Sequence, residues 1–165
     1  MKLNSLRDLY ITELKDLYDA ENRITKALPK LAEAASAQDL RSAFELHLEQ
    51  TRRHAERLEQ IFRKLDESPK GQKCKGVIGI IDEGQDLMDE DTPAAVRDAA
   101  LIATAQRVEH YEIAAYGTCR TYAQRLGYAD HAQLLNETLQ EEGEADKKLT
   151  SLAESFINED AKSAR

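Results

Sequence analysis

Residues 106–116 read QRVEHYEIAAY, a helix-forming stretch that places carboxylates on its apolar side. At about 100° per residue, Glu109 and Glu112 share a helix face with Ile113 and Tyr116, while His110 lies about a quarter turn away. Burying an unpaired charge costs several kcal/mol, so inward carboxylates need protons, basic partners or metal ions. This stretch therefore predicts a long helix that carries a polar site on its buried face.

The composition around this stretch favours a single all-α domain. The 165 residues contain only three Pro and seven Gly, and strong helix formers dominate the chain. A chain of this length can bury a sizeable core. We expect no sheet, one domain over residues 1–157, and a polar, disordered tail over residues 158–165.

Charge and cysteine content exclude several classes of protein. The formal charge is −8 and the basic residues are scattered, so we expect no nucleic-acid partner. No apolar run approaches the roughly 18 residues of a membrane span, and the N-terminus has no signal-peptide pattern. Cys74 and Cys119 form no CxxC or Cys/His cluster, which predicts neither a zinc site nor a disulfide. A cytoplasmic protein is expected.

Helical periodicity predicts four long helices, at about residues 5–35, 37–67, 93–127 and 130–157. Expected caps are Asn4 or Ser5 for the first helix, Thr92 before Pro93 for the third, and Asp130 for the fourth. Gly127 is expected to end the third helix. Pro29 predicts a kink or break in the first.

The connections predict the topology. Short links near Ser36 and at residues 126–130 favour two antiparallel hairpins. Residues 68–92 form a long link with a short helix, which can carry the chain back so that the second and third long helices run parallel. This predicts a ferritin-like four-helix bundle with a crossover.

Each of the other long helices also turns polar side chains inward. Counting residues from the hairpin turns places all of them near the middle of the bundle, and Arg120 lies about two turns from this layer. Carboxylates with imidazoles suit iron or manganese. We therefore predict a carboxylate-rich, dinuclear iron or manganese site drawn from Glu21, His47, Gln50, His54, Glu109, Glu112, Glu142 and Asp146.

Several segments resemble a known family. YDAENRITKALPKLAEAAS, HLEQTRRHAERL, RDAALIATAQRVEHYEIAAYGT and LNETLQEEGEADKKLTSLA are similar to the YciE/YciF family of bacterial stress proteins, in the ferritin-like, rubrerythrin-related superfamily. In that superfamily Glu21 matches the lone ligand of the first helix. Glu109 and Glu112 match the ExxE of the third helix, and Glu142 matches the glutamate of the fourth.

The chain also departs from the superfamily pattern. The Glu-x-x-His of the second helix is missing, with His47, Gln50 and His54 in its place, and Glu142 to Asp146 leaves no histidine on the fourth. The rubredoxin-like cysteine module of full rubrerythrins is absent, which excludes electron transfer through it.

Simpler roles compete for several of these residues. His47 and His54 could be core histidines, Asp146 could pair with Arg53, and Glu109 and Glu112 could border an ordinary core. We interpret His110 as an interface residue or one that supports a ligand. Buried hydroxyls of Tyr10 and Tyr116 should find carboxylates.

The expected function is oxidation of Fe(II) or consumption of peroxide in a stress-associated homodimer that binds metal ions. One alternative is a non-enzymatic dimeric structural protein that has lost metal chemistry. Another is an interaction protein that exposes an apolar patch around Val77, Ile78 and Ile81.

Overall fold

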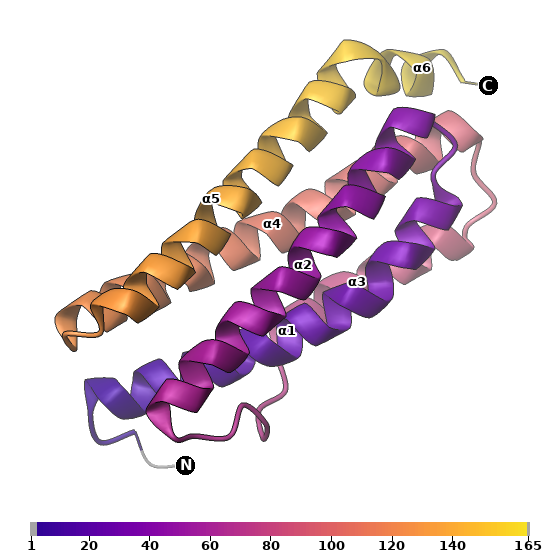
Figure 1. Cartoon of the computed structure of the whole chain (residues 1–165). Coiled ribbons are helices and arrows are strands. Elements are labelled where there is room, and N and C mark those ends of the chain that lie inside the picture. The colour runs from indigo at the N-terminus through magenta and orange to yellow at the C-terminus, as the bar shows by residue number, and fades with distance from the viewer. Residues whose placement is uncertain (1–2, 165) are drawn as a thin grey trace.

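The computed structural model describes residues 3–164, and every regular element within them is helical. Four long helices lie side by side (Figure 1): α1 (Leu6–Ala34), α2 (Gln38–Leu65), α4 (Ala94–Arg125) and α5 (Ala129–Leu152). The prediction of an all-α fold is confirmed. A shorter helix, α3 (Lys75–Asp89), lies in the long link and packs against α1 and α4.

The long helices pack in two sequential pairs, α1 with α2 and α4 with α5. Contacts of α1 with α4 and of α2 with α5 join the pairs. In Figure 1, α2 and α4 both start at the upper right and run to the lower left, and α3 carries the chain back between them. Each long helix therefore passes the middle of the molecule.

Helix α1 begins as predicted but does not break at Pro29. The Ser5 hydroxyl accepts a hydrogen bond from the Asp8 amide at 3.1 Å, which makes Ser5 the N-cap. A kink or break was predicted at Pro29, and the break is contradicted because α1 runs on through this residue. Pro29 is exposed, whereas Leu28 and Leu31 on either side are buried, so packing keeps the helix continuous across the missing amide.

The predicted caps at Thr92 and Asp130 are also wrong. Helix α4 starts one residue later, with Pro93 as an N-cap that makes no side-chain hydrogen bond. Asp130 lies inside the first turn of α5, after Tyr128 at the N-cap position, and pairs with Lys64 of α2. Gly127 ends α4 as predicted, because it takes the left-handed backbone, at φ +79°, that a chain reversal needs.

Helix α2 receives its N-terminal cap from another helix. Ala37 at its N-cap position offers no side-chain acceptor. Asp98 of α4, only 3 % exposed, accepts the Ser36 and Ala37 amides at 2.8 Å each. Its negative charge lies where the helix dipole favours an anion. This contact ties the start of α2 to the start of α4.

The C-terminal residues are helical, contrary to the expected disordered tail. A π-helical turn (Ala153–Ile157) follows α5 and leads into α6 (Asn158–Ser163). Ile157 is only 2 % exposed, and both the π-helical turn and α6 pack against α4. This anchoring explains why a polar segment stays helical.

The core consists of two apolar clusters separated by a polar layer. In α2, one cluster contains Leu40 and Phe44, and the other contains Leu58, Ile61 and Phe62. The same division occurs in α1, α4 and α5. Buried polar residues fill the gap between the clusters, so the polar layer lies at mid-helix, as predicted.

Helix α3 turns one side toward the core, including part of the apolar patch that the sequence suggested was exposed. Val77 is fully buried, and Ile78 and Ile81 are half-buried, so they form no exposed apolar patch. Two glycines allow α3 to approach α4 closely: a Cβ on Gly76 would lie 2.6 Å from the Tyr111 ring, and one on Gly84 would lie 2.5 Å from the Thr104 methyl.

Candidate metal centre

The polar layer brings together six of the eight predicted site residues. Each is at most 5 % exposed, and together they come from all four long helices: Glu21 (α1), His47 and His54 (α2), Glu109 and Glu112 (α4), and Glu142 (α5). Two overlapping groups of ligand atoms lie within 4.8 Å of one another. One contains His47, Glu109, Glu112 and Glu142, and the other contains Glu21, His54 and Glu142. Glu142 is shared between them.

The His54 ring is oriented by contacts on both of its nitrogens. Its Nδ1 lies 2.8 Å from Glu142 Oε1 and 3.4 Å from Glu21 Oε1. Its Nε2 lies 2.8 Å from Glu141 Oε2, at the outer edge of the layer. Arg57 holds Glu141 in turn, through contacts of 2.6 and 3.1 Å to its two oxygens. A carboxylate on the outer nitrogen is how proteins commonly orient a metal-binding imidazole.

His47 has a similar arrangement. Its Nδ1 lies 3.3 Å from the Gln50 side-chain oxygen. Its Nε2 points toward the carboxylates, 3.3 Å from Glu109 Oε1 and 3.6 Å from Glu142 Oε2. Both imidazoles therefore present one nitrogen to the polar layer and use the other for support.

The inward-facing atoms lack the hydrogen bonds that buried polar atoms normally have. Among the described residues, no hydrogen bond satisfies His47 Nε2, His54 Nδ1, Glu21 Oε2, Glu109 Oε2 or either carboxylate oxygen of Glu112 and Glu142. The imidazole nitrogens lie close to the carboxylate oxygens, but the angles between them are not those of hydrogen bonds. A cluster of buried nitrogen and oxygen atoms without hydrogen-bond partners is costly unless something such as a cation compensates it. The donor set fits a metal site.

Burial changes the protonation of the cluster unevenly. Burial, and then the charges of neighbouring carboxylates, raise the pKa values of Glu109 and Glu112 well above the ordinary range. Burial also raises the pKa of Glu21, although His54 opposes this shift. Burial alone would raise the pKa of Glu142, but close contact with His54 and His47 lowers it to about 2. Burial would lower the pKa of His54, but Glu21 and Glu142 raise it to about 10.

Gln50 and Asp146 lie outside the group of ligand atoms. Gln50 contacts the outer nitrogen of His47. Asp146 Oδ1 accepts a hydrogen bond from Gln106 at 2.9 Å and lies 3.2 Å from His110, instead of pairing with Arg53. The His110 side chain is 69 % exposed, which confirms that it lies on the flank of its helix.

Sequence reasoning missed Glu141 and Arg57. Glu141 adjoins Glu142, and Arg57 follows His54 by three residues, so helical spacing alone could have suggested both. The expectation for Tyr116 is confirmed, because its hydroxyl donates to Glu21 Oε1. The Tyr10 hydroxyl instead lies 3.3 Å from His131 Nδ1, so the prediction of a carboxylate partner for Tyr10 was wrong.

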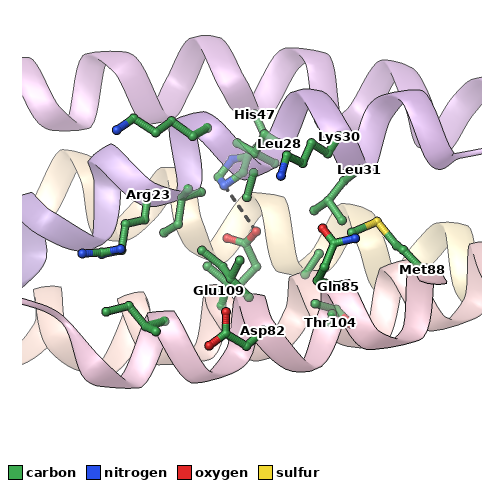
Figure 2. A pocket seen from close by; sticks show the side chains of 18 residues that line it. Arg23, Leu28, Lys30, Leu31, His47, Asp82, Gln85, Met88, Thr104 and Glu109 are labelled. Carbon is green, nitrogen blue, oxygen red and sulfur yellow. Dashed lines mark ion pairs between the residues drawn. The ribbon is translucent and has the colours of Figure 1, made fainter.

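Two pockets approach the site at the same place. One, of about 230 Å³, lies between α1, α3 and α4, and Figure 2 shows it with the His47–Glu109 pair. The other, of about 410 Å³, lies between α2 and α5 and contains Gln50 and Glu144. His47 and Glu109 line both pockets, so small molecules can approach that edge of the site from two sides.

None of the helices within residues 3–164 is long and apolar enough to cross a membrane.

Comparison with known proteins identifies the family. Protein YciF of Escherichia coli K12 is 45 % identical over 162 residues, which cover 98 % of each chain. The crystal structure of the E. coli stress protein YciF matches with a TM-score of 0.90 and 46 % identity, over 94 % of this chain and 98 % of that one.

Two further solved structures have the same fold. YcfI of Rhodopseudomonas palustris, provisionally described as a structural protein, matches with a TM-score of 0.88 and 43 % identity, over 91 % of this chain and 96 % of that one. A Xanthomonas campestris protein matches in fold, with a TM-score of 0.74, 19 % identity and coverage of 93 % and 94 %. The model of the domain of unknown function DUF892 matches residues 5–162. The chain therefore belongs to the DUF892 family and is a relative of YciF.

Proposed function

We propose that this protein is a ferritin-like four-helix bundle, with α3 in its crossover, that holds a dinuclear iron or manganese centre at mid-bundle. The observation that carries the proposal is the pair of overlapping donor groups with Glu142 in common. Two groups of donors could hold two ions, and all six donor residues are carboxylates or imidazoles, which suit iron or manganese. The structure of the relative YciF is that of a stress protein, which supports a role in stress.

The chain's own residues would bind and orient the centre. Glu109, Glu112, Glu142 and Glu21 would supply negative charge, and His47 and His54 would supply one nitrogen each. Glu141 and Gln50 would keep the outer nitrogens occupied, so that the inner ones face the ions. When bound, an iron or manganese pair would supply one-electron chemistry toward oxygen or peroxide. The two apolar clusters would limit water around the layer.

Metal content and Fe(II) oxidation test the proposal together. The protein is loaded anaerobically with Fe(II) or Mn(II), and metal per chain is measured after desalting. Glu112→Gln keeps the side-chain shape but removes a fully buried donor, so it should bind far less metal and oxidise Fe(II) much more slowly. The matched control is Glu56→Gln, an exposed acid on α2, which should behave like the wild type.

Retention of stoichiometric metal by Glu112→Gln would contradict a centre in this layer. Full metal binding with no turnover of Fe(II) or peroxide would instead support the second candidate function, a non-enzymatic dimeric structural protein. That candidate is favoured by one observation, the structural role provisionally given to the relative YcfI. A homodimer belongs to both proposals, and sedimentation of the purified protein would test it.

A further inference from the structure

Only one edge of the polar layer reaches the two pockets. Among the six donor residues, His47 is 5 % exposed and Glu109 is 2 % exposed, whereas the other four are fully buried. The same two residues line the pocket between α1, α3 and α4 and the pocket between α2 and α5. An ion that comes from solvent by way of a pocket must therefore pass this edge.

The pocket between α1, α3 and α4 opposes the entry of a cation. Lys26 and Lys30 are exposed, line the α1 side, and form no ion pair with the residues that the structure describes. Asp82 lies on the opposite, α3 rim (Figure 2). Most of the other lining side chains are apolar, among them Leu28 and Met88. The lysines repel a divalent ion, and apolar walls cannot replace the water that the ion would lose.

The pocket between α2 and α5 has the opposite character. Its rim carries two exposed acids, Asp39 of α2 and Glu144 of α5, with one exposed base, Lys148. Gln50 also lines this pocket, and its side-chain oxygen lies 3.3 Å from His47 Nδ1. The acids attract a divalent ion, and carboxylate and amide oxygens can replace part of its water. This pocket therefore favours the approach of a cation.

The floor of this pocket must move before an ion can bind. His47 Nε2 and Glu109 Oε2 are closed to solvent, so neither atom can reach an ion that waits in the pocket. His47 is the more loosely held of the two imidazoles, because its outer nitrogen has a 3.3 Å contact with the neutral Gln50. The outer nitrogen of His54 has a 2.8 Å contact with the carboxylate of Glu141. The imidazole with the weaker support is thus the one that lines the pocket.

We propose that divalent metal ions enter and leave the centre through the pocket between α2 and α5, past a displaced His47 ring, and do not pass between α1, α3 and α4. Asp39 and Glu144 would raise the concentration of ions at the mouth, and His47 would return to ligate the ion once it has passed. This inference rests on the proposed function, because it supposes a centre to be filled. A narrowed route slows uptake and release together and leaves the final metal content unchanged, which separates a route from a ligand.

Uptake and release are measured on the full-length, chelator-treated protein under nitrogen. Mn(II) is added, samples are quenched with EDTA at set times and desalted, and bound manganese is measured; excess EDTA added to the loaded protein gives the release rate. Asp39→Asn/Glu144→Gln should slow uptake by roughly threefold to tenfold at low ionic strength, and the difference should shrink in about 0.5 M salt. The matched pair Glu33→Gln/Glu56→Gln removes two exposed acids that line neither pocket, and it should load like the wild type.

Bulky substitutions at two half-buried alanines compare the pockets. Ala145→Trp narrows the pocket between α2 and α5, so it should slow uptake and release alike by roughly tenfold or more, with wild-type manganese content at the end. Ser42→Trp, at an exposed position on the α2 wall, makes the same test if Ala145→Trp does not fold. Ala27→Trp narrows the other pocket and should leave both rates unchanged. Gln50→Ala removes the contact that holds His47 and should raise both rates.

Four results would overturn the proposal. They are wild-type rates in a folded Ala145→Trp or Ser42→Trp variant, equal slowing by Ala27→Trp, equal uptake by the two acid-to-amide pairs at low ionic strength, and no rise in either rate with Gln50→Ala. Each of them removes only the route, because the wild type still takes up manganese. A wild type that binds no manganese would instead remove the proposed centre itself.

Discussion

Replacing Glu112 with Gln should have opposite effects on stability in the metal-free and metal-loaded protein. Glu112 is fully buried, neither of its oxygens has a hydrogen-bond partner among the described residues, and burial raises its pKa well above 4.5. The folded chain therefore binds this proton more tightly than the unfolded chain does. Stability contributed by the protonated form is lost as the pH rises above 4.5, because unfolding then releases the proton.

The size of the effect has an upper bound. At pH 7 the buried carboxyl can lower the free energy of unfolding by no more than the cost of keeping it protonated. That cost is about 1.4 kcal/mol for each pH unit above its ordinary pKa. For Glu112 this bound is about 3.5 kcal/mol at pH 7 and close to zero at pH 4.5. Since Gln never ionises, Glu112→Gln should recover part of this free energy. For 165 residues the gain in melting temperature is at most roughly 7 to 14 °C.

Metal should reverse the order of the two proteins. A ligand bound only by the folded state at 100 times its dissociation constant adds about 2.7 kcal/mol of stability. The wild type should gain this stabilisation with Fe(II) or Mn(II), and Glu112→Gln should gain little of it. The assay is thermal unfolding of wild type, Glu112→Gln and the exposed control Glu56→Gln at pH 5 and pH 7, with chelator or with metal.

Two results would refute this reasoning. One is a Glu112→Gln variant that is less stable than the wild type at pH 7 in chelator, since the buried carboxyl would then have a stabilising partner. The other is an equal rise in melting temperature for both proteins on adding metal, which would place the ion away from Glu112.

Three further predictions concern individual buried contacts, each measured by urea unfolding. Asp98→Ala should destabilise the fold by about 2 to 4 kcal/mol, because two amides at the start of α2 lose a charged acceptor. Tyr116→Phe should cost about 1 to 3 kcal/mol in the metal-free protein, because Glu21 loses its buried donor. Gly84→Leu should cost about 1 to 3 kcal/mol through its clash with Thr104, whereas the matched substitution at the uncrowded Gly79 should cost nothing.

The sequence predicted the positions of the helices and the buried acids for the same reason. A 3.6-residue period reports which side chains face inward, and Glu21, Glu109, Glu112 and Glu142 are all buried. Asp146 follows Glu142 by one turn, yet it lies at the edge of the layer beside Gln106. Periodicity gives an angle around the helix axis, but it does not show which neighbour a side chain of intermediate angle contacts.

Errors at helix ends have a different cause. The Pro29 break and the disordered tail were inferred from local residue preferences, but the burial of Leu28, Leu31 and Ile157 against other helices outweighs those preferences. Asp98 as the cap of α2 could not be found by local rules, because it lies 61 residues from the amide of Ala37. Contacts of this kind depend on how the hairpins pack.

The six donor residues divide three and three along the order of synthesis, but the two halves differ in chemistry. The half made first, α1 and α2, contains both imidazoles and Glu21, whereas the half made last, α4 and α5, contains Glu109, Glu112 and Glu142. A nascent chain that has folded only its first half therefore has a single carboxylate of this set and cannot assemble either donor group. Under the proposed function, both donor groups would form only after the second half docks against the first. Metal uptake during translation would then report completion of the tertiary structure.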